Sequence, residues 1–295
     1  MNIVTWNTQW CKGIDGIVSP ERIIAGARSL LDFDVLCLQE VSINYPGLTG
    51  DTAANQALEI QSLLPDYQIV FGAAVDEQPL GKSERQQFGN LIASRLPILS
   101  IQKVSLPSPV EVNDPKPGMA RICLICTVQA PWGPVRIMTT HLEYYSQFQR
   151  QAQISAIADW HDMASLQALH ALAPKPNDAD TPYQGKPHTL DAVLCGDFNF
   201  ETPSAEYRTI TEDTGTNPAR INPLRDAWVH CHPDQPHPPT FRLYDSTYGP
   251  EPISCDFFFV SASLADRIRK VRVDTLTQVS DHQPVSLELN GSLSG

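Results

Sequence analysis

The sequence predicts a layered α/β fold, in which strands outnumber the helices that lie between some of them. Short apolar runs with the character of strands recur along the whole chain and make up more than half of the predicted elements, which argues against a helical bundle. Hydrophobic residues account for 42% of the 295 residues and charged residues for 18%, as is typical of globular proteins. Because no linker or internal repeat divides the chain, we expect a single domain over residues 1–295.

The first half of the chain is predicted to hold most of the strands. The first helix begins after Ser19, a favourable N-cap, with Pro20 at its first position, and the second helix is stopped by Pro65. The turn Pro131-Trp132-Gly133-Pro134 indicates a hairpin. In order, we expect a strand at 2–6, a helix at 19–31, a short apolar strand at 35–38, a helix at 53–64, and strands near 68–73, 91–94, 98–104, 119–129 and 135–140.

The second half of the chain is predicted to open with the longest helix, over 148–172, because this segment is rich in Ala, Gln and Leu. Residues 174–189 contain four prolines and read as a loop insertion. The remaining expected elements are a strand at 192–195, a helix near 204–212, a Pro/His-rich loop at 230–240, and strands at 257–260, 271–275 and 285–289.

The charge and composition exclude several classes of protein. The chain has a formal net charge of −12, which argues against a protein that coats nucleic acid through bulk charge but allows an enzyme that holds one phosphate at a metal site. No apolar run approaches the ~20 residues that a membrane span requires. Because the first residues lack the pattern of a signal peptide, we expect a cytoplasmic protein, and we expect it to be a monomer.

The seven cysteines are odd in number and scattered, without the spacing of a disulfide framework. Cys123 and Cys126 lie three apart in a predicted strand, so their side chains should point to opposite faces, which does not suit a zinc site. We therefore expect buried free thiols in a reducing compartment.

Polar residues repeatedly stand where an apolar strand ends, a position that holds functional groups on a rigid base. Carboxylates and Asn amides are hard oxygen ligands that suit Mg²⁺, Mn²⁺ or Ca²⁺, and histidines beside them add an acid or base at neutral pH. Such a set points to metal-assisted attack on a phosphate ester. Five of these residues follow apolar strands and two precede one: Asn7, Glu40, His141, Asp197 and Asn199 follow, and Asp281 and His282 precede the strand at 285–289.

Each of these residues also has a purely structural interpretation. Asn7 is compatible with a turn cap, Glu40 with a solvated carboxylate and His141 with a hydrogen-bonded structural histidine. Asp256 is different because it lies inside the apolar run 253–260. A buried carboxylate is costly unless it is paired, and an imidazole is a natural partner.

Taken together, these residues belong to seven sequence blocks that occur in the order seen in the endonuclease/exonuclease/phosphatase superfamily, which the chain resembles from residue 6 to residue 282. Any one block is a weak signal, but seven in order are strong. The blocks are Trp6-Asn7, Leu38-Gln39-Glu40, Gly89-Asn90 with Ser94-Arg95-Leu96-Pro97-Ile98, Thr140-His141-Leu142, Gly196-Asp197-Phe198-Asn199, Asp256 and Ser280-Asp281-His282.

The resemblance implies a four-layer α/β sandwich of the deoxyribonuclease I type, in which two packed, mainly antiparallel sheets are flanked by helices and a metal lies at the mouth. It implies Glu40 as the principal Mg²⁺ ligand, helped by Asn7 and Asp281, with Mn²⁺ or Ca²⁺ as alternatives. Asp197 and Asn199 should line the site.

Roles for the histidines follow from the same resemblance. His282 should contact the phosphate or accept the proton of the attacking water, with Asp256 orienting its imidazole, and the family leaves open whether Asp197 or His282 is the base. His141 should donate to a phosphate oxygen and stabilise the transition state.

The subfamily is not fixed by these motifs. Gln9 replaces the acidic residue of abasic-site endonucleases, and Thr140-His141-Leu142-Glu143 is closer to the blocks of neutral sphingomyelinases, deadenylases and tyrosyl-DNA phosphodiesterases. Arg85, Asn90 and Arg150 are further candidates for substrate binding.

The motifs predict a Mg²⁺-dependent phosphodiesterase, either a nuclease or a nucleotide phosphodiesterase. The alternative is a phosphohydrolase that acts on phospholipid headgroups or small phosphate esters, which the acidic balance supports. A third reading, a binding module without activity, would require loss of the site, yet each core position holds a competent residue.

Overall fold

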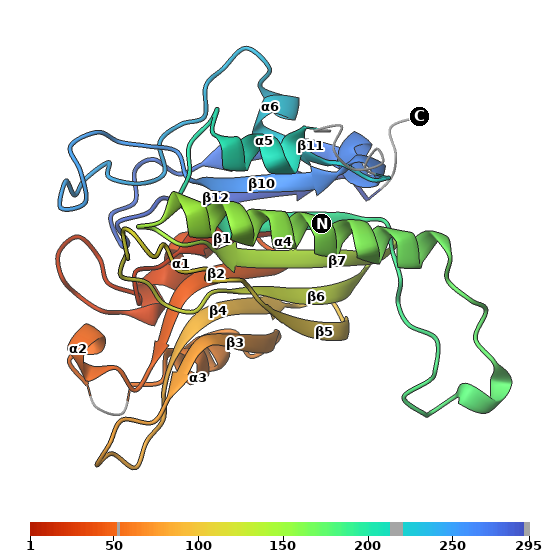
Figure 1. Ribbon diagram of the computed structural model, residues 1–295, viewed down its shortest axis with the longest axis horizontal. Helices are drawn as coiled ribbons and strands as arrows, with labels where there is room; N and C mark the ends of the chain where they lie inside the picture. Colours follow the sequence, from red (N-terminus) through yellow and green to blue (C-terminus); the bar gives the residue numbers. More distant parts are fainter. Residues whose placement is uncertain (52–53, 213–220, 292–295) are drawn as a thin grey trace.

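Two six-stranded sheets pack face to face in the computed structural model, which describes residues 1–51, 54–212 and 221–291 (Figure 1). Sheet I has the order β11 (Ile268–Val273), β12 (Val285–Leu289), β1 (Asn2–Asn7), β2 (Val35–Ile43), β4 (Gln86–Ser94) and β3 (Gln68–Glu77). Sheet II has the order β5 (Ile98–Ser105), β6 (Ile122–Ala130), β7 (Gly133–His141), β8 (Ala192–Asp197), β10 (Asp256–Ser261) and β9 (Leu224–Asp226).

Helices cover the outer face of each sheet, which gives the expected four layers (Figure 1). Helices α1 (Pro20–Leu30) and α3 (Gln56–Leu63) pack on sheet I, whereas α4 (Gln147–Leu169) and α5 (Ala205–Thr211) pack on sheet II. The strand pairs are antiparallel except β1–β2 and β7–β8, so the predicted mainly antiparallel sandwich is confirmed.

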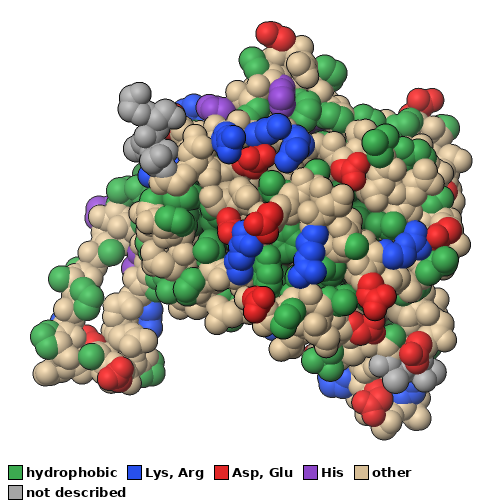
Figure 2. Space-filling view, turned by 180° about the vertical axis from the view of Figure 1, so that it is seen from behind, with side chains coloured by type: hydrophobic (Ala, Val, Ile, Leu, Met, Phe, Trp, Pro, Cys, Tyr) green, Lys and Arg blue, Asp and Glu red, His purple; other side chains and the backbone are tan. Residues whose placement is uncertain are grey.

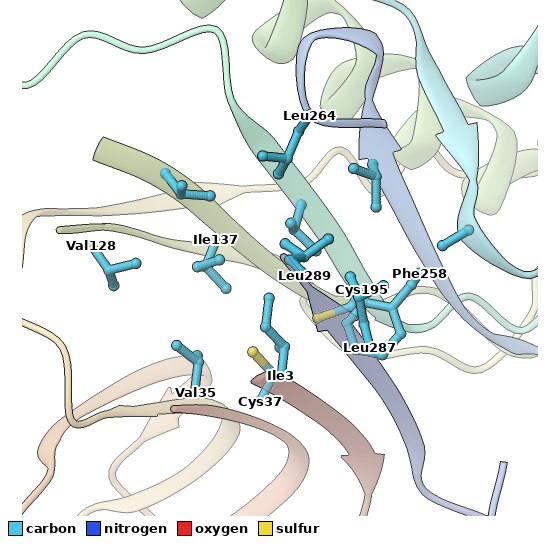
Figure 3. Packing of buried hydrophobic residues seen from close by; sticks show 14 of the residues in the cluster. Ile3, Val35, Cys37, Val128, Ile137, Cys195, Phe258, Leu264, Leu287 and Leu289 are labelled. Atoms are coloured by element: carbon cyan, nitrogen blue, oxygen red, sulfur yellow. The ribbon is translucent and has the colours of Figure 1, made fainter. Parts of the chain in front are cut away.

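The buried apolar residues form three clusters, one between the two sheets and one between each sheet and its helices. The central cluster lies between the sheets and includes Ile3, Cys37, Ile137 and Leu287 (Figure 3). Strands buried on both faces read as continuous apolar runs, which is why the short run at 35–38 could be recognised in the sequence. Cys126 belongs to this central cluster and Cys123 to the cluster under α4, so the two thiols do point to opposite faces. All seven cysteines are free, and all except Cys231 are buried.

Local signals placed α1 and α3 well. Ser19 caps α1 by accepting a hydrogen bond from the Arg22 N–H, with Pro20 as the first residue. Helix α3 starts at Gln56 rather than at residue 53, because the Asn55 side chain accepts from the Leu58 N–H and caps the helix there. Residue 53 itself lies outside the described residues.

Several predicted boundaries were wrong. Strands β3 and β4 pair over their full lengths as one long hairpin, so each is longer than its apolar run, because the ladder bonds continue through polar residues at the tip. Strand β11 begins and ends earlier than expected. Elements too short to show a period were not predicted, namely the strand β9, the helices α2 (Pro46–Thr49) and α6 (Ala227–Cys231), and the 3₁₀ turns at Pro176–Asp178 and Ala262–Arg267.

The insertion at 174–189 stands away from the body of the protein in both views (Figure 1, Figure 2). It leaves from the end of α4 and returns to the start of β8, opposite the edge where the predicted site residues lie. No helix in the described part of the chain is both long and apolar enough to cross a membrane.

Candidate active site

Two parallel strand pairs bring the predicted residues to one edge of the sandwich. In sheet I, Asn7 at the end of β1 lies opposite Gln39, next to Glu40. In sheet II, His141 at the end of β7 lies opposite Asp197 at the end of β8. Because the carboxyl ends of parallel strands meet at the same edge, residues far apart in the sequence become neighbours.

Glu40 is positioned by an irregularity in β2. The register against β4 shifts between Leu38 and Val41, and Glu40 adopts a left-handed backbone conformation with φ of 60°. The sequence predicted that the strand ends at Leu38, whereas β2 continues to Ile43 through this bulge. Bulges re-aim a side chain next to a site, and here the bulge turns the Glu40 carboxylate toward Asn7.

Gly196 allows β8 to place Asp197 at the same edge of the sandwich. Its φ of +135° is a backbone conformation that glycine adopts readily and other residues rarely adopt. A Cβ at this position would lie 2.0 Å from the Thr140 carbonyl oxygen. The close approach of β7 and β8 therefore requires glycine. Beyond the strand, the Asn199 backbone N–H donates to Asp197 Oδ1 at 2.9 Å, and the Asn199 amide donates to the Leu142 carbonyl at 2.9 Å.

Asp197 Oδ2 lies at the centre of the site. The Asn7 amide donates to it at 2.9 Å and to Glu40 Oε1 at 3.1 Å, so Asn7 bridges the two carboxylates. His141 Nε2 lies 3.4 Å and His282 Nε2 3.6 Å from the same oxygen. Burial on its own raises the pKa of Asp197, but His282, His141 and Asn7 together hold that pKa below its usual value.

The expected contact between Asp256 and His282 is confirmed. His282 Nδ1 lies 2.9 Å from Asp256 Oδ2, although 26 positions separate the residues. Burial lowers the pKa of His282, yet Asp256 and Asp197 outweigh it and raise that pKa to about 10. The ring of Phe241 stacks on the imidazole at a centroid distance of 4.2 Å and an angle of 16°, which fixes the orientation of the ring.

The remaining oxygen donors fit a hard divalent cation. Glu40 and Asp281 line the cleft together with Asp197, and burial followed by the charge of Asp281 raises the pKa of Glu40 to about 7. Burial likewise raises the pKa of Asp281. Carboxylates crowded in this way repel one another, and a bound cation would relieve that repulsion.

A second group of ligand-type atoms lies deeper in the site. The ligand atoms of Asp197, Cys255, Asp256 and His282 all lie within 4.8 Å of one another, and all four residues are buried. Here Asp256 already hydrogen-bonds His282, and burial keeps the pKa of the Cys255 thiol well above its usual range. The oxygen donors around Glu40 are therefore the residues that could hold a metal, and this deeper group supports the imidazole.

Comparison with known proteins identifies the family of the chain. The model of the Endonuclease/Exonuclease/phosphatase family matches residues 4–282. The chain belongs to this family. Because members of the endonuclease/exonuclease/phosphatase family are hydrolases that act on phosphate esters, the protein is an enzyme of that class. No curated protein matches the chain.

Solved structures share the family fold at low sequence identity. A family protein from Beutenbergia cavernae is 22% identical with a TM-score of 0.63, and the match covers 98% of this chain and 71% of that chain. A mannosyl-6-phosphatase from Bacteroides thetaiotaomicron is 18% identical with a TM-score of 0.65, covering 98% and 99%. D. rerio TDP2 complexed with a single-strand DNA product is 17% identical with a TM-score of 0.64, covering 98% of both chains.

The candidate site opens into a cleft of about 930 Å³. Glu40, His141, Asp197, Asn199, Asp281 and His282 all line it, whereas Asp256 lies behind His282. The rest of the wall is rich in aromatic side chains, namely Trp10, Tyr45, Phe88, Tyr144, Tyr145, Phe241 and Tyr248.

The three further candidates for substrate binding lie outside the lining of this cleft. Arg85 is exposed and pairs with Asp76, with Nε 2.6 Å from Oδ1. The Asn90 amide is buried behind the site and donates to the Ile122 carbonyl at 3.3 Å. Arg150 donates to the Tyr144 carbonyl at 2.7 Å and so supports the loop after β7 from behind. Direct contact of these three with substrate stays a prediction.

The sequence analysis missed a buried pair in the wall of the cleft. Arg121 lies beside His141, with its Nε 3.4 Å from Glu143 Oε2. Arg121 is 6% exposed and its Nη1 has no hydrogen-bond partner among the described residues. The available signal was its position directly before the apolar strand β6, which mirrors the strand-end positions of the predicted site residues.

Proposed function

We propose that the protein is a Mg²⁺-dependent phosphodiesterase that holds a single phosphate group among Glu40, His141, Asp197 and His282. The observation that carries the proposal is the convergence on Asp197 Oδ2 of Asn7, His141 and His282, with Glu40 and Asp281 beside it. Bound Mg²⁺ would neutralise charge on the phosphoryl oxygens.

Different residues activate the water and stabilise the phosphoryl group during hydrolysis. The Asp197 carboxylate, held by Asn7 and the Asn199 N–H, accepts the proton of the attacking water. The water oxygen forms a bond to phosphorus as the bond to the leaving oxygen breaks. His282 has a carboxylate near each nitrogen and stays protonated, so it faces the phosphoryl oxygens as a cation. Burial lowers the pKa of His141 to about 3, so His141 is neutral and faces the same oxygens as a hydrogen-bond donor.

Of the two substrate classes that the sequence left open, the cleft favours small phosphate esters. Arg121 is the one Lys or Arg among the described residues that line the cleft, and it is already paired with Glu143. A long nucleic acid would bring phosphates that meet no cation. A second candidate, hydrolysis of a nucleotide or a short single strand, is favoured by the similarity to D. rerio TDP2 in its complex with a single-strand DNA product.

The test is Glu40→Gln, which keeps the shape of the side chain and removes its charge. We expect Mg²⁺ affinity, measured by calorimetry, and hydrolysis of bis-p-nitrophenyl phosphate to fall together, the rate by ~10²-fold or more. EDTA should abolish the activity of the unmodified protein. The matched control is Glu84→Gln, an exposed carboxylate outside the lining of the cleft. Full activity of the Glu40 variant in Mg²⁺ would show that the site is assigned wrongly.

A further inference from the structure

The free edge of sheet I carries a large share of the positive charge of the chain. Strand β11 lies at this edge, because it pairs with β12 alone. Charged side chains at the edge of a sheet discourage pairing with another chain, so some charge is expected here. Figure 2 shows several Lys and Arg side chains close together near the top of the visible face, with an acidic group beside them. Four of the 21 Lys and Arg residues lie in or next to β11, namely Arg267, Arg269, Lys270 and Arg272.

The cations of β11 outnumber their acidic partners. Glu288 on β12 is shared by two of them, with Oε1 3.2 Å from Arg272 Nη2 and Oε2 3.6 Å from Arg269 Nη1. Lys270 stands opposite Glu288 in the ladder, yet it makes no ion pair among the described residues. The Nε of Arg272 is buried and has no hydrogen-bond partner in the described part of the chain. Positive charge is therefore left over at Lys270 and Arg272, although the net charge of the chain is −12.

A groove of about 510 Å³ lies at the same edge. Arg272 forms part of its lining and reaches the end of α1, where Nη2 donates to the Leu30 carbonyl at 3.4 Å. From α6 and its C-cap come Trp228 and His232, whose ring centroids lie 4.2 Å apart at an angle of 38°. His232 Nε2 lies 3.3 Å from the Val271 carbonyl oxygen, so α6 occupies the place beside β11 that a further strand would take. The groove therefore combines cations from β11 with rings from the α6 segment.

The size and lining of the groove suit a small ligand that joins a flat ring to an anionic group. Small-molecule sites have volumes of roughly 300–1,000 Å³, and this groove lies within that range. Asp274 is the one carboxylate in the lining among the described residues, and its Oδ1 accepts a hydrogen bond from the Leu276 N–H at 2.9 Å. Lys270 and Arg272 therefore remain in excess. Protection of the strand edge explains these cations alone, whereas it does not explain a groove with two rings beside them.

We propose that this groove is a second binding site, for a small aromatic anion of the nucleoside monophosphate kind. The phosphate would contact Lys270 and Arg272, because charge-assisted hydrogen bonds to phosphate are stronger than neutral ones. The base would pack against Trp228 and His232, because aromatic rings stack favourably on one another. Among the described residues, none lines both this groove and the active-site cleft, so the two sites are separate. The inference therefore does not depend on the proposed function.

The test measures binding by calorimetry in EDTA, so that no divalent cation draws a phosphate into the active-site cleft. The probes are AMP, adenosine, which lacks the phosphate, and ribose 5-phosphate, which lacks the base. We expect AMP to bind at least about tenfold more tightly than either of the others, because only AMP uses both the cations and the rings.

A matched pair of lysine variants locates the site. Lys270→Gln should weaken the binding of AMP by about tenfold, because the phosphate loses a charged hydrogen-bond donor. Lys103→Gln, the control, should leave the affinity as in the unmodified protein. Lys103 is also exposed and also lies on an edge strand, β5 of sheet II, but it is outside the groove. Both side chains are exposed, so neither substitution disturbs the core.

Four results would overturn the inference. AMP that does not bind in EDTA would exclude the site, and adenosine or ribose 5-phosphate that binds as tightly as AMP would exclude the class of ligand. An affinity for AMP that is unchanged in Lys270→Gln would place the ligand elsewhere on the protein. Equal weakening by Lys270→Gln and Lys103→Gln would mean that only the overall charge attracts AMP. Hydrolysis of bis-p-nitrophenyl phosphate in Mg²⁺ is measured separately and bears on the proposed function alone.

Discussion

The pair of Asp256 and His282 gives the sharpest test of the site, because its two members should act as one unit. Asp256 Oδ2 lies 2.9 Å from His282 Nδ1, and the Asp256 backbone N–H is itself anchored on the Thr240 hydroxyl at 3.2 Å. Asp256 does not line the cleft, so it acts on the reaction only through the imidazole. Asp256→Asn keeps the shape but removes the charge that holds His282 protonated.

The expected magnitude follows from this arrangement. Loss of a positioned acid, base or charge-stabilising histidine costs ~10²–10⁴ in rate, which corresponds to roughly 2.7–5.4 kcal/mol. We expect Asp256→Asn and His282→Ala to fall in that range and the double variant to be little worse than either. The coupling energy of the cycle would then be about as large as one single effect.

The assay is kcat/KM for bis-p-nitrophenyl phosphate at saturating Mg²⁺ for the four proteins of the cycle. The chain offers a matched control in His237 and Asp226, a second, partly buried pair with Nε2 2.8 Å from Oδ2 that does not line the cleft. His237→Gln should lower stability without lowering kcat/KM. Multiplicative losses in the cycle would refute the reasoning, because they would mean that the two residues act independently.

Two further predictions concern the strand edge and the surface. Gly196→Ala should lower the free energy of unfolding in urea by ~3 kcal/mol or more, because the added Cβ would lie 2.0 Å from the Thr140 carbonyl oxygen. Gly133 has a similar φ of +136° but no atom within 4 Å of an added Cβ, so Gly133→Ala should lower the same free energy by only ~1–2 kcal/mol. Equal losses would contradict the steric argument. We expect duplex DNA to bind the inactive variant Asp197→Asn at constant Mg²⁺ with a slope of log affinity against log salt concentration that is shallower than about −3. The reason is that the net charge is −12 and that Lys, Arg, Asp and Glu are interspersed on the face seen in Figure 2. A slope near −6 would indicate instead an enzyme that tracks the groove of the duplex.

Local sequence signals determined much of the fold because they act over a few residues. Ser19 and Pro20 set the start of α1, Pro65 stopped α3, and apolar runs marked the buried strands. Where hydrogen bonding extends past the apolar residues, as in β3 and β4, the sequence alone gave strands that were too short, because the ladder and not the side chains continues them.

The types of residue in the site were also determined by the sequence, since oxygen ligands and histidines at strand ends already indicate phosphate chemistry. Only the tertiary structure, however, places these side chains next to one another. Asn7, His141 and Asp197 become neighbours only because β1–β2 and β7–β8 are parallel pairs in two sheets that face each other. The bulge that turns Glu40 inward depends on pairing with β4, and the burial of Arg121 beside Glu143 depends on packing between distant segments. Register and packing are set by contacts between residues far apart in the chain, which no local pattern encodes.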